Sequence, residues 1–400
     1  MAWSRERMSI GAYFATMGFV CAAWVSSIPD LKALLGLDDA QLGRLLMWGP
    51  VGTATSYTFV SSLIARIGSR RSTLIGASGQ VLSAAALAVG FAISAPYPYW
   101  CASLAMLGAF GNIHNISANT QGGLAELRAG SSIMSGFHGL WSVANLTGAF
   151  IALAASCLML PVHLRMGVTL ALAAVLVVKG RGGLIASDPS RVPAGAKERA
   201  RWIWPGWELV GLGLIAMVFM GCEGSVYDWV GVFYRDVLKV PQQRVLMGYC
   251  AVMAAMTVGR FSTDALVNRF SATYVVRSYS LLAFAGLVIA LWSPAFTGLS
   301  GLPLHMVVTA GYALAGFGIS GLVPIVYART ARVTTVSHGT AVTIVASFGF
   351  LGFFAGPPLI GAISKVHGLT VALTVFAVLI LFGLLFGIGG NRGGSASSAN

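Results

Sequence analysis

Apolar segments of roughly 20 residues recur along the whole chain, and this feature most constrains its fold. Such a segment can cross a hydrocarbon core of about 30 Å as an α-helix, which satisfies its own backbone hydrogen bonds. Of the 400 residues, 56% are hydrophobic and 9% are charged, whereas a soluble domain has about 25% charged residues. The sequence therefore predicts an all-α integral membrane protein and excludes a soluble enzyme.

Breaks at Gly, Pro and charged clusters divide the chain into twelve predicted transmembrane helices. An even number of helices places both termini on the same side of the membrane. Lys and Arg are more frequent in the loops on that side, so we expect both termini to face the cytoplasm. The expected helices are 8–29, 42–65, 73–94, 98–124, 134–157, 161–179, 207–233, 245–267, 273–293, 303–328, 336–363 and 368–388.

The two halves of the chain resemble each other in sequence. Trp24 and Trp229 lie about 205 residues apart, and Arg66 and Arg269 lie about 203 residues apart. This slowly drifting spacing agrees with the predicted helices and indicates a duplicated six-helix unit. We expect an N-terminal bundle over 1–180, a cytoplasmic linker over 181–206, a C-terminal bundle over 207–388 and a disordered tail over 389–400.

Several short motifs lie in register with these helices. The most specific are EGS at 223–225 with DW at 228–229, TVGRF at 257–261, GPP at 356–358 and the basic loop IARIGSRR at 64–71. Together they resemble the major facilitator superfamily and, within it, the YbjJ/MosC-like branch. The resemblance implies a transporter of the bacterial inner (plasma) membrane that binds its substrate near the midplane, between two six-helix bundles. At the position of Asn115 the branch usually has an acidic residue.

Two carboxyl groups lie inside a predicted helix, at Glu223 and Asp228. An ionisable side chain in hydrocarbon costs at least about 2.5 to 3.5 kcal/mol, so it usually faces a cavity, pairs or has a function. No Lys or Arg is near Glu223 in sequence, and a carboxyl group without a cationic partner can carry a proton. Glu223 and Asp228 are therefore the predicted proton-coupling residues.

Structural roles are the alternative for both carboxyl groups. Asp228 could pair at the rim with Arg235 or Arg244. Glu223 could pair with Arg260, although we expect Arg260 to lie near the cytoplasmic end of its helix.

Polar side chains are unusually frequent in the predicted helix 98–124. Asn115 and Asn119 share one face, and His114 lies on the opposite face. One face would line a cavity and the other would bond to a neighbouring helix, and the sequence leaves open which is which. Trp24 and Trp229 could contact substrate or belong to interfacial aromatic belts. The predicted substrate-binding residues are Trp24, His114, Asn115, Asn119, Asn145, Trp229 and Tyr312.

The basic loops between helices carry a further prediction. In the superfamily that the chain resembles, these loops hold the cytoplasmic side closed. Arg260 and Asp264 are four residues apart on one helix and could join this latch. The predicted gating residues are Arg66, Arg70, Arg71, Arg260, Asp264 and Arg269.

We expect a secondary active transporter that moves a small polar metabolite by alternating access and is coupled to protons. A drug or toxin efflux antiporter and a transporter-like ligand sensor without net flux are the alternatives. No GxxxxGK[ST] phosphate loop and no set of metal ligands is present, so neither ATP-driven pumping, nor a cofactor, nor a metal is expected. The net charge of +13 lies in short loops, which indicates membrane topology rather than nucleic-acid binding. The expected partners are the substrate, protons and the lipid bilayer, and the protein is expected to be a monomer and not an enzyme.

Overall fold

The computed structural model describes residues 4–129, 133–186, 206–330 and 338–386, and every regular element in these ranges is a helix. The first half contains α1 (Arg5–Val25), α2 (Ile28–Leu35), α3 (Asp39–Leu46), α4 (Trp48–Tyr57), α5 (Val60–Ile67), α6 (Ser69–Ala92), α7 (Tyr97–Ala129), α8 (Met134–Cys157) and α9 (Val162–Gly180). The second half contains α10 (Trp207–Val232), η1 (Phe233–Val237), η2 (Gln242–Arg244), α11 (Met247–Phe270), α12 (Ala272–Phe296), α13 (Gly301–Ile319), α14 (Leu322–Thr330), α15 (His338–His367), α16 (Leu369–Leu379) and η3 (Ile380–Leu385).

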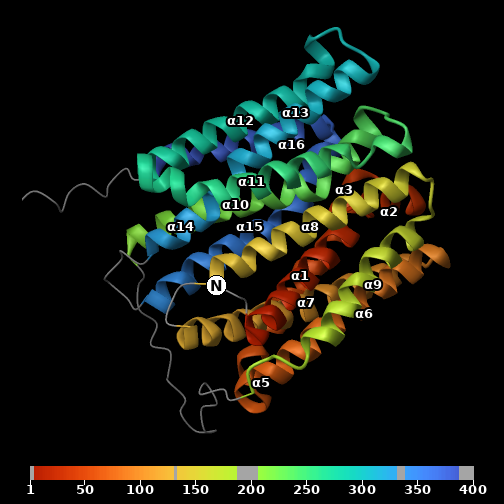
Figure 1. Cartoon of the computed structure of the whole chain (residues 1–400). Coiled ribbons are helices and arrows are strands. Elements are labelled where there is room, and N and C mark those ends of the chain that lie inside the picture. Colours follow the sequence, from red (N-terminus) through yellow and green to blue (C-terminus); the bar gives the residue numbers. More distant parts are fainter. Residues whose placement is uncertain (1–3, 130–132, 187–205, 331–337, 387–400) are drawn as a thin grey trace, which may run out of the picture.

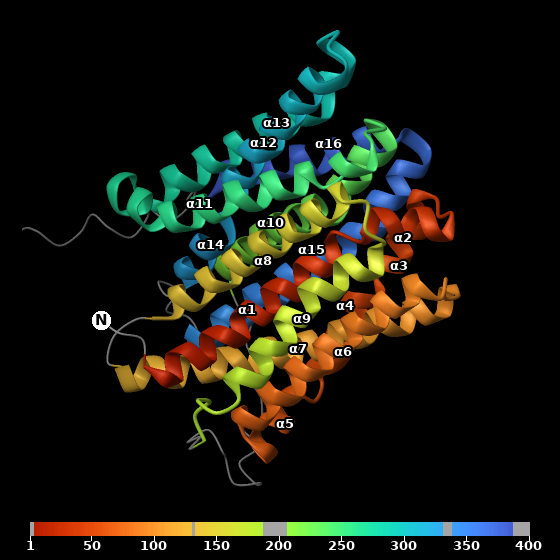
Figure 2. The same cartoon turned by 45° about the vertical axis from the view of Figure 1, so that its right-hand side comes forward.

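In the described ranges these helices make twelve passes along the bundle, six in each half, which confirms the predicted fold. Figures 1 and 2 show α1 to α9 and α10 to α16 as two adjacent groups. The groups meet along two seams, where α8 packs on α11 and α3 packs on α15. We call the end of the bundle at which α1 begins the terminal end, and the opposite end, which carries α2, the distal end (Figure 1).

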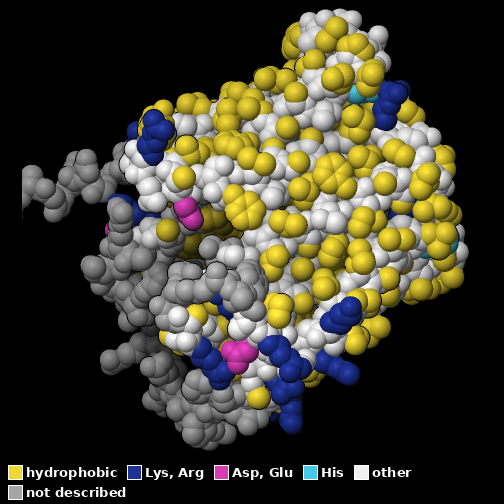
Figure 3. Space-filling view, in the orientation of Figure 1, with side chains coloured by type: hydrophobic (Ala, Val, Ile, Leu, Met, Phe, Trp, Pro, Cys, Tyr) yellow, Lys and Arg dark blue, Asp and Glu magenta, His cyan; other side chains and the backbone are white. Residues whose placement is uncertain are grey.

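Nine stretches of the described chain are long and apolar enough to span a membrane by length and composition. The other passes are the broken run α3 to α5, the polar α7 and the shorter α16 with η3. Figure 3 shows hydrophobic side chains across the middle of the visible face, with Lys and Arg gathered toward its ends. This distribution fits a bilayer around the middle of the bundle.

The second pass differs from the single predicted helix 42–65, because it is divided into α3, α4 and α5. Pro50 lies in the first turn of α4 and has no N–H to donate to the carbonyl of Leu46. Farther along, the hydroxyls of Ser56 and Thr58 donate to carbonyls three residues back and compete with the helical backbone bonds. These two local effects account for the breaks.

The turn between the second and third passes has the same backbone conformation in both halves. Gly68, before α6, has φ 84° and ψ 156°, and Ser271, before α12, has φ 81° and ψ 151°. The two positions are about 203 residues apart, as are Arg66 and Arg269. The internal repeat read from the sequence is therefore repeated in the backbone.

Candidate functional site

Charged side chains join the two halves at the distal end. Asp30 of α2 accepts from Arg165 of α9 at 2.6 Å and from Arg235 of η1 at 2.7 Å. Lys32 of α2 pairs with Asp236 of η1, which also crosses between the halves. Arg165 and Asp30 are largely buried, so these contacts are little screened by solvent.

The backbones also approach closely at this end. A Cβ atom at Gly43 of α3 would lie 2.4 Å from the carbonyl oxygen of Pro357 on α15, and one at Gly361 would lie 2.4 Å from the carbonyl oxygen of Asp39. Only glycine permits such approaches. The distal end of the interface is therefore closed by both side chains and backbone.

At the terminal end the contacts are of another kind. On the terminal side of the middle, Tyr57 of α4 meets Phe350 of α15 with ring centroids 5.7 Å apart, and the ring of Phe261 on α11 lies against Gly139 on α8. The ion pairs between described residues at this end stay within one half, as Arg128 with Glu6 and Arg329 with Glu208. Figure 3 shows the surface hollowed between the two halves on this side. The interface is thus tight at one end and looser at the other.

A polar cluster lies between these ends, at the middle of the interface. Tyr227 donates to Oε1 of Glu223 at 2.9 Å, and Nη2 of Arg260 donates to the same oxygen at 3.0 Å. Nη1 of Arg260 donates to Oγ of Ser142 in the other half at 2.9 Å. The guanidinium also lies over the ring of Trp141, 5.0 Å from its centroid. Arg260 is therefore shared between a carboxylate of its own half and α8 of the other half.

These contacts correct two expectations. Glu223 is paired with Arg260, as its structural alternative required, and is not a solitary carboxyl group. Arg260 lies in the central cluster and not in a latch with Asp264 at the end of the bundle. The reason is that side chains of a helix point toward its N-terminus, which for α11 is the distal end, so the long Arg260 side chain reaches back to the level of Glu223.

A second set of polar groups crosses the interface next to this cluster. Tyr249 of α11 donates to Oδ1 of Asn145 on α8 at 2.7 Å, and both side chains are buried. The thiol of Cys21 on α1 lies beside Asn145, and the carboxyl groups of Glu223 and Asp228 are in its neighbourhood. The two predicted carboxyl groups and Asn145 therefore lie close together, between α1, α8 and α10.

Asp228 does not pair at the rim as the structural alternative required. Arg235 is engaged by Asp30, and Arg244 lies 3.4 Å from Nδ1 of His305. Asp228 is half-buried and has no hydrogen bond or ion pair with a described residue.

The two faces of α7 have different surroundings, although both bond to a neighbouring helix, since Asn112, in line with Asn115, donates to Oγ of Ser56 on α4 at 2.8 Å. His114 is fully buried, with Nδ1 2.7 Å from Oε1 of Gln80 on α6. Gln121, on the same face, donates to Oγ of Ser69 at 2.7 Å. Asn115 is exposed, and Asn119 donates to its Oδ1 at 2.7 Å. His114 thus lies inside the first half, whereas Asn115 and Asn119 are on the accessible face of α7.

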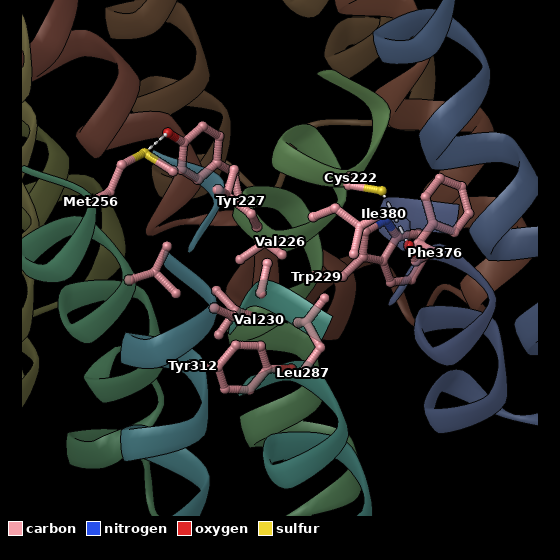
Figure 4. Close-up of a cluster of buried hydrophobic side chains, with 14 of the residues drawn as sticks. Cys222, Val226, Tyr227, Trp229, Val230, Met256, Leu287, Tyr312, Phe376 and Ile380 are labelled. Atoms are coloured by element: carbon pink, nitrogen blue, oxygen red, sulfur yellow. Dashed lines mark hydrogen bonds between the residues drawn. The ribbon is translucent and has the colours of Figure 1, made fainter. Parts of the chain in front are cut away.

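The three aromatic residues that were predicted to contact substrate also lie in different places. Trp229 and Tyr312 are buried in the core of the second half, as Figure 4 shows, and Tyr312 packs against Phe233 with centroids 6.0 Å apart. Trp24 is half-buried and packs against hydrophobic clusters of both halves. Of the three, Trp24 alone lies at the interface.

The remaining predicted gating residues lie at the terminal end. Arg66, Arg71, Asp264 and Arg269 are exposed. Arg70 is half-buried, and its Nη2 lies 3.5 Å from the carbonyl oxygen of Arg181. Their gating role stays a prediction.

Sequence reasoning missed several residues of the interface. Tyr227 could have been found, because it follows Glu223 by four residues and such pairs meet on a helix. Trp141 and Ser142 share a helical face with the predicted Asn145, but their partner Arg260 is far away in sequence. The distal charges Asp30 and Arg235 are also far apart in sequence and gave no signal. Among the described residues, no group of three or more His, Cys, Asp or Glu could hold a metal ion.

No protein-family model matches the chain. Over 379 residues it is 29% identical to an uncharacterized MFS-type transporter of Yersinia pestis, covering 94% of the chain and 93% of that protein. It is 28% identical over 384 residues to the membrane protein MosC of Rhizobium meliloti, covering 91% of the chain and 85% of that protein.

Solved structures share the fold. A mutant of the nucleoside transporter NupG has a TM-score of 0.73 at 12% identity, covering 96% of this chain and 98% of that one. The D-xylose-proton symporter has a TM-score of 0.71 at 13% identity, covering 96% of each chain. The resemblance read from the motifs is confirmed: this multi-pass membrane protein is similar over nearly its whole length to an MFS-type transporter and to MosC, and it shares the fold of these solved transporters.

Proposed function

We propose that the protein is a proton-coupled secondary transporter that moves a small polar metabolite across the bacterial inner membrane by alternating access. The observation that carries this proposal is the chain of contacts from Glu223 through Arg260 to Ser142, which links a carboxylate of one half to a hydroxyl of the other. The relative described as an MFS-type transporter and the fold shared with a xylose-proton symporter support it.

The chemistry follows from the shared guanidinium. When Glu223 is ionised, its charge fixes Arg260 at 3.0 Å, in reach of Ser142 and Trp141. A proton on the carboxylate removes the charge that attracts Arg260, so the position of Arg260 and its contact with the other half change. Gain and loss of this proton can therefore bias which end of the interface opens.

The present conformation is closed at the distal end by the contacts of Asp30, Lys32 and Gly43. With both termini in the cytoplasm, the looser terminal end faces inward. The protein would then be in an inward-facing state and act as a monomer, since each half supplies residues to the central cluster.

The test begins with purified protein and a panel of small polar metabolites, of which those that raise its thermal stability are taken forward. Radiolabelled ligand is then measured in proteoliposomes under an imposed pH gradient. We expect pH-driven accumulation in the parent protein. Glu223→Gln should lose that accumulation and keep exchange of internal for external ligand. Binding without uptake in any condition would favour a ligand sensor.

The matched control is Glu208→Gln, because Glu208 is a second carboxylate of α10 that is 56% exposed and lies outside the central cluster. It should leave accumulation unchanged. Undiminished pH-driven accumulation in Glu223→Gln would show that the proton is carried elsewhere.

A further inference from the structure

Asp228 faces the other half of the protein. It lies on α10 three residues before Gly231 and seven before Arg235, so the three share one face of the helix. A Cβ atom at Gly231 would lie 2.5 Å from the ring of Pro29 on α2, and Arg235 binds Asp30. The interaction of Asp228 with Cys21 of α1 agrees with this placement.

The charges around Asp228 leave it without compensation. Glu223 and Arg260 neutralise each other, and Arg235 is held by Asp30. Lys32, the next cation along the interface, is held by Asp39 and Asp236. Because a half-buried carboxylate is strongly destabilised without a partner, a positive charge is missing at this position of the interface.

A hydrogen-bond donor without an oxygen or nitrogen partner lies close by. Asn145 is fully buried, and Tyr249 donates to its Oδ1, but its Nδ2 has no hydrogen-bond partner in the described structure. The neighbouring thiol of Cys21 is at most a weak acceptor for this amide. Buried polar groups are normally satisfied, so an unpaired donor indicates an absent acceptor. A carboxylate without a cation and an amide that has only a thiol beside it therefore both lie near Cys21, and they are supplied by opposite halves.

We propose that this place binds a substrate with one protonated amino group beside a hydroxyl or carbonyl oxygen. The ammonium group donates to the carboxylate of Asp228, and the neighbouring oxygen accepts from Nδ2 of Asn145. Glu223 then binds and releases the proton and does not contact the ammonium group. This inference rests on the proposed function and names its substrate class.

The experiment compares amines with their neutral counterparts on the purified full-length protein. The pairs are 2-aminoethanol with ethylene glycol, serinol with glycerol, and glucosamine with glucose. Binding is measured by thermal stabilisation and then by calorimetry. We expect an amine of at least one pair to bind while its neutral counterpart binds at least about 30-fold more weakly.

Substitutions then assign the contacts. Asp228→Asn should weaken amine binding at least about 30-fold and remove the preference over the neutral counterpart, whereas Asp228→Glu should keep the preference. Asn145→Ala should weaken amine binding about 10-fold. Glu208→Gln is the unaffected control, and the unliganded melting temperature of each variant reports whether it folds.

Three results would overturn the inference: unchanged amine affinity in Asp228→Asn, binding confined to the neutral compounds, or stabilisation by Na⁺ alone that Asp228→Asn abolishes. Its failure is distinct from that of the proposed function. Loss of amine binding in Asp228→Asn together with intact pH-driven accumulation in Glu223→Gln would leave the substrate class standing and refute the proton site.

Discussion

At the distal end the two halves are joined by ion pairs and by close backbone crossings, whereas toward the terminal end the described contacts between them include one aromatic pair and the packing of Phe261 on Gly139. Ion pairs and glycine crossings need accurate geometry and are lost within a small displacement. Apolar ring contacts tolerate sliding. The distal contacts therefore specify one closed arrangement, and the terminal end is free to differ between states.

The largest expected effect comes from Asp30→Ala, which leaves Arg165 and Arg235 without their shared carboxylate. Removal of one partner of a buried ion pair costs about 3 to 5 kcal/mol, so the closed distal state should lose most of its population. Pulsed electron paramagnetic resonance between labels at the exposed Leu34 and Lys239 measures the distance across this end. The distance should lengthen.

The matched control for that experiment is Glu6→Ala, which removes the exposed pair with Arg128 inside one half. It should change the free energy by no more than about 1 kcal/mol and leave the distal distance unchanged. Equal effects of both substitutions would remove the proposed distinction between the two ends.

Next in size is Gly43→Ala, which forces a methyl group against the backbone of Pro357 on α15. Overpacking costs about 1 to 3 kcal/mol, and here the cost falls on the closed distal state alone. The same pair of labels should report partial opening. Gly167→Ala is the control, because nothing lies within 4 Å of a Cβ atom at Gly167. Opening in both variants would point to a general loss of stability.

A smaller effect is expected at the terminal end from Ser271→Gly. Ser271 has a backbone conformation with φ 81° that favours glycine, while the equivalent Gly68 already is glycine. The exchange should raise the free energy of unfolding by about 1 kcal/mol, reduced by a few tenths because the hydroxyl no longer accepts from the Tyr274 N–H. Thermal unfolding in detergent measures this.

The reverse exchange, Gly68→Ser, should destabilise the protein by a similar amount. Stabilisation by Gly68→Ser, or no difference between the two exchanges, would show that the two turns are not equivalent.

The smallest effect concerns Asp38 and Lys365, an exposed pair across the distal end with atoms 3.4 Å apart. The hydrogen bond from the Gln41 N–H, and next the charge of Lys365, lower the pKa of Asp38 below 3.8. The charge of Asp38 therefore contributes stability above pH 3.8, and this contribution is lost as the pH falls through the lowered pKa. Asp38→Asn keeps a helix cap, so its melting temperature should be slightly below that of the parent at about pH 6, and this difference should shrink as the pH falls below 3.8.

The sequence predicted the fold and part of the site for a simple reason. Length and hydrophobicity are local properties, so the passes could be read from the chain, and the rarity of carboxyl groups in hydrocarbon selected Glu223 and Asp228, whose roles stay predictions. The face of α7 that carries His114 could not be assigned, because both faces are polar and only packing against α6 distinguishes them.

Contacts between distant segments were beyond the sequence. The partner of Glu223 depends on how far α10 and α11 are offset along the bundle, and a helical pattern gives rotation but not that offset. Asp30 and Arg235 lie about 205 residues apart, and no local sequence pattern in either segment predicts that the two side chains pair. The break at Pro50 was hidden because the surrounding residues remain apolar.

The broken second pass has a mechanical consequence. α3 packs mainly on α15 of the other half, whereas α4 packs mainly on α7 of its own half. Where Pro50 interrupts the backbone hydrogen bonds, a helix resists bending least. A displacement of α15 that moves α3 is therefore expected to bend the chain near Pro50. In this way α3 can follow the opposite bundle while α4 stays packed on α7.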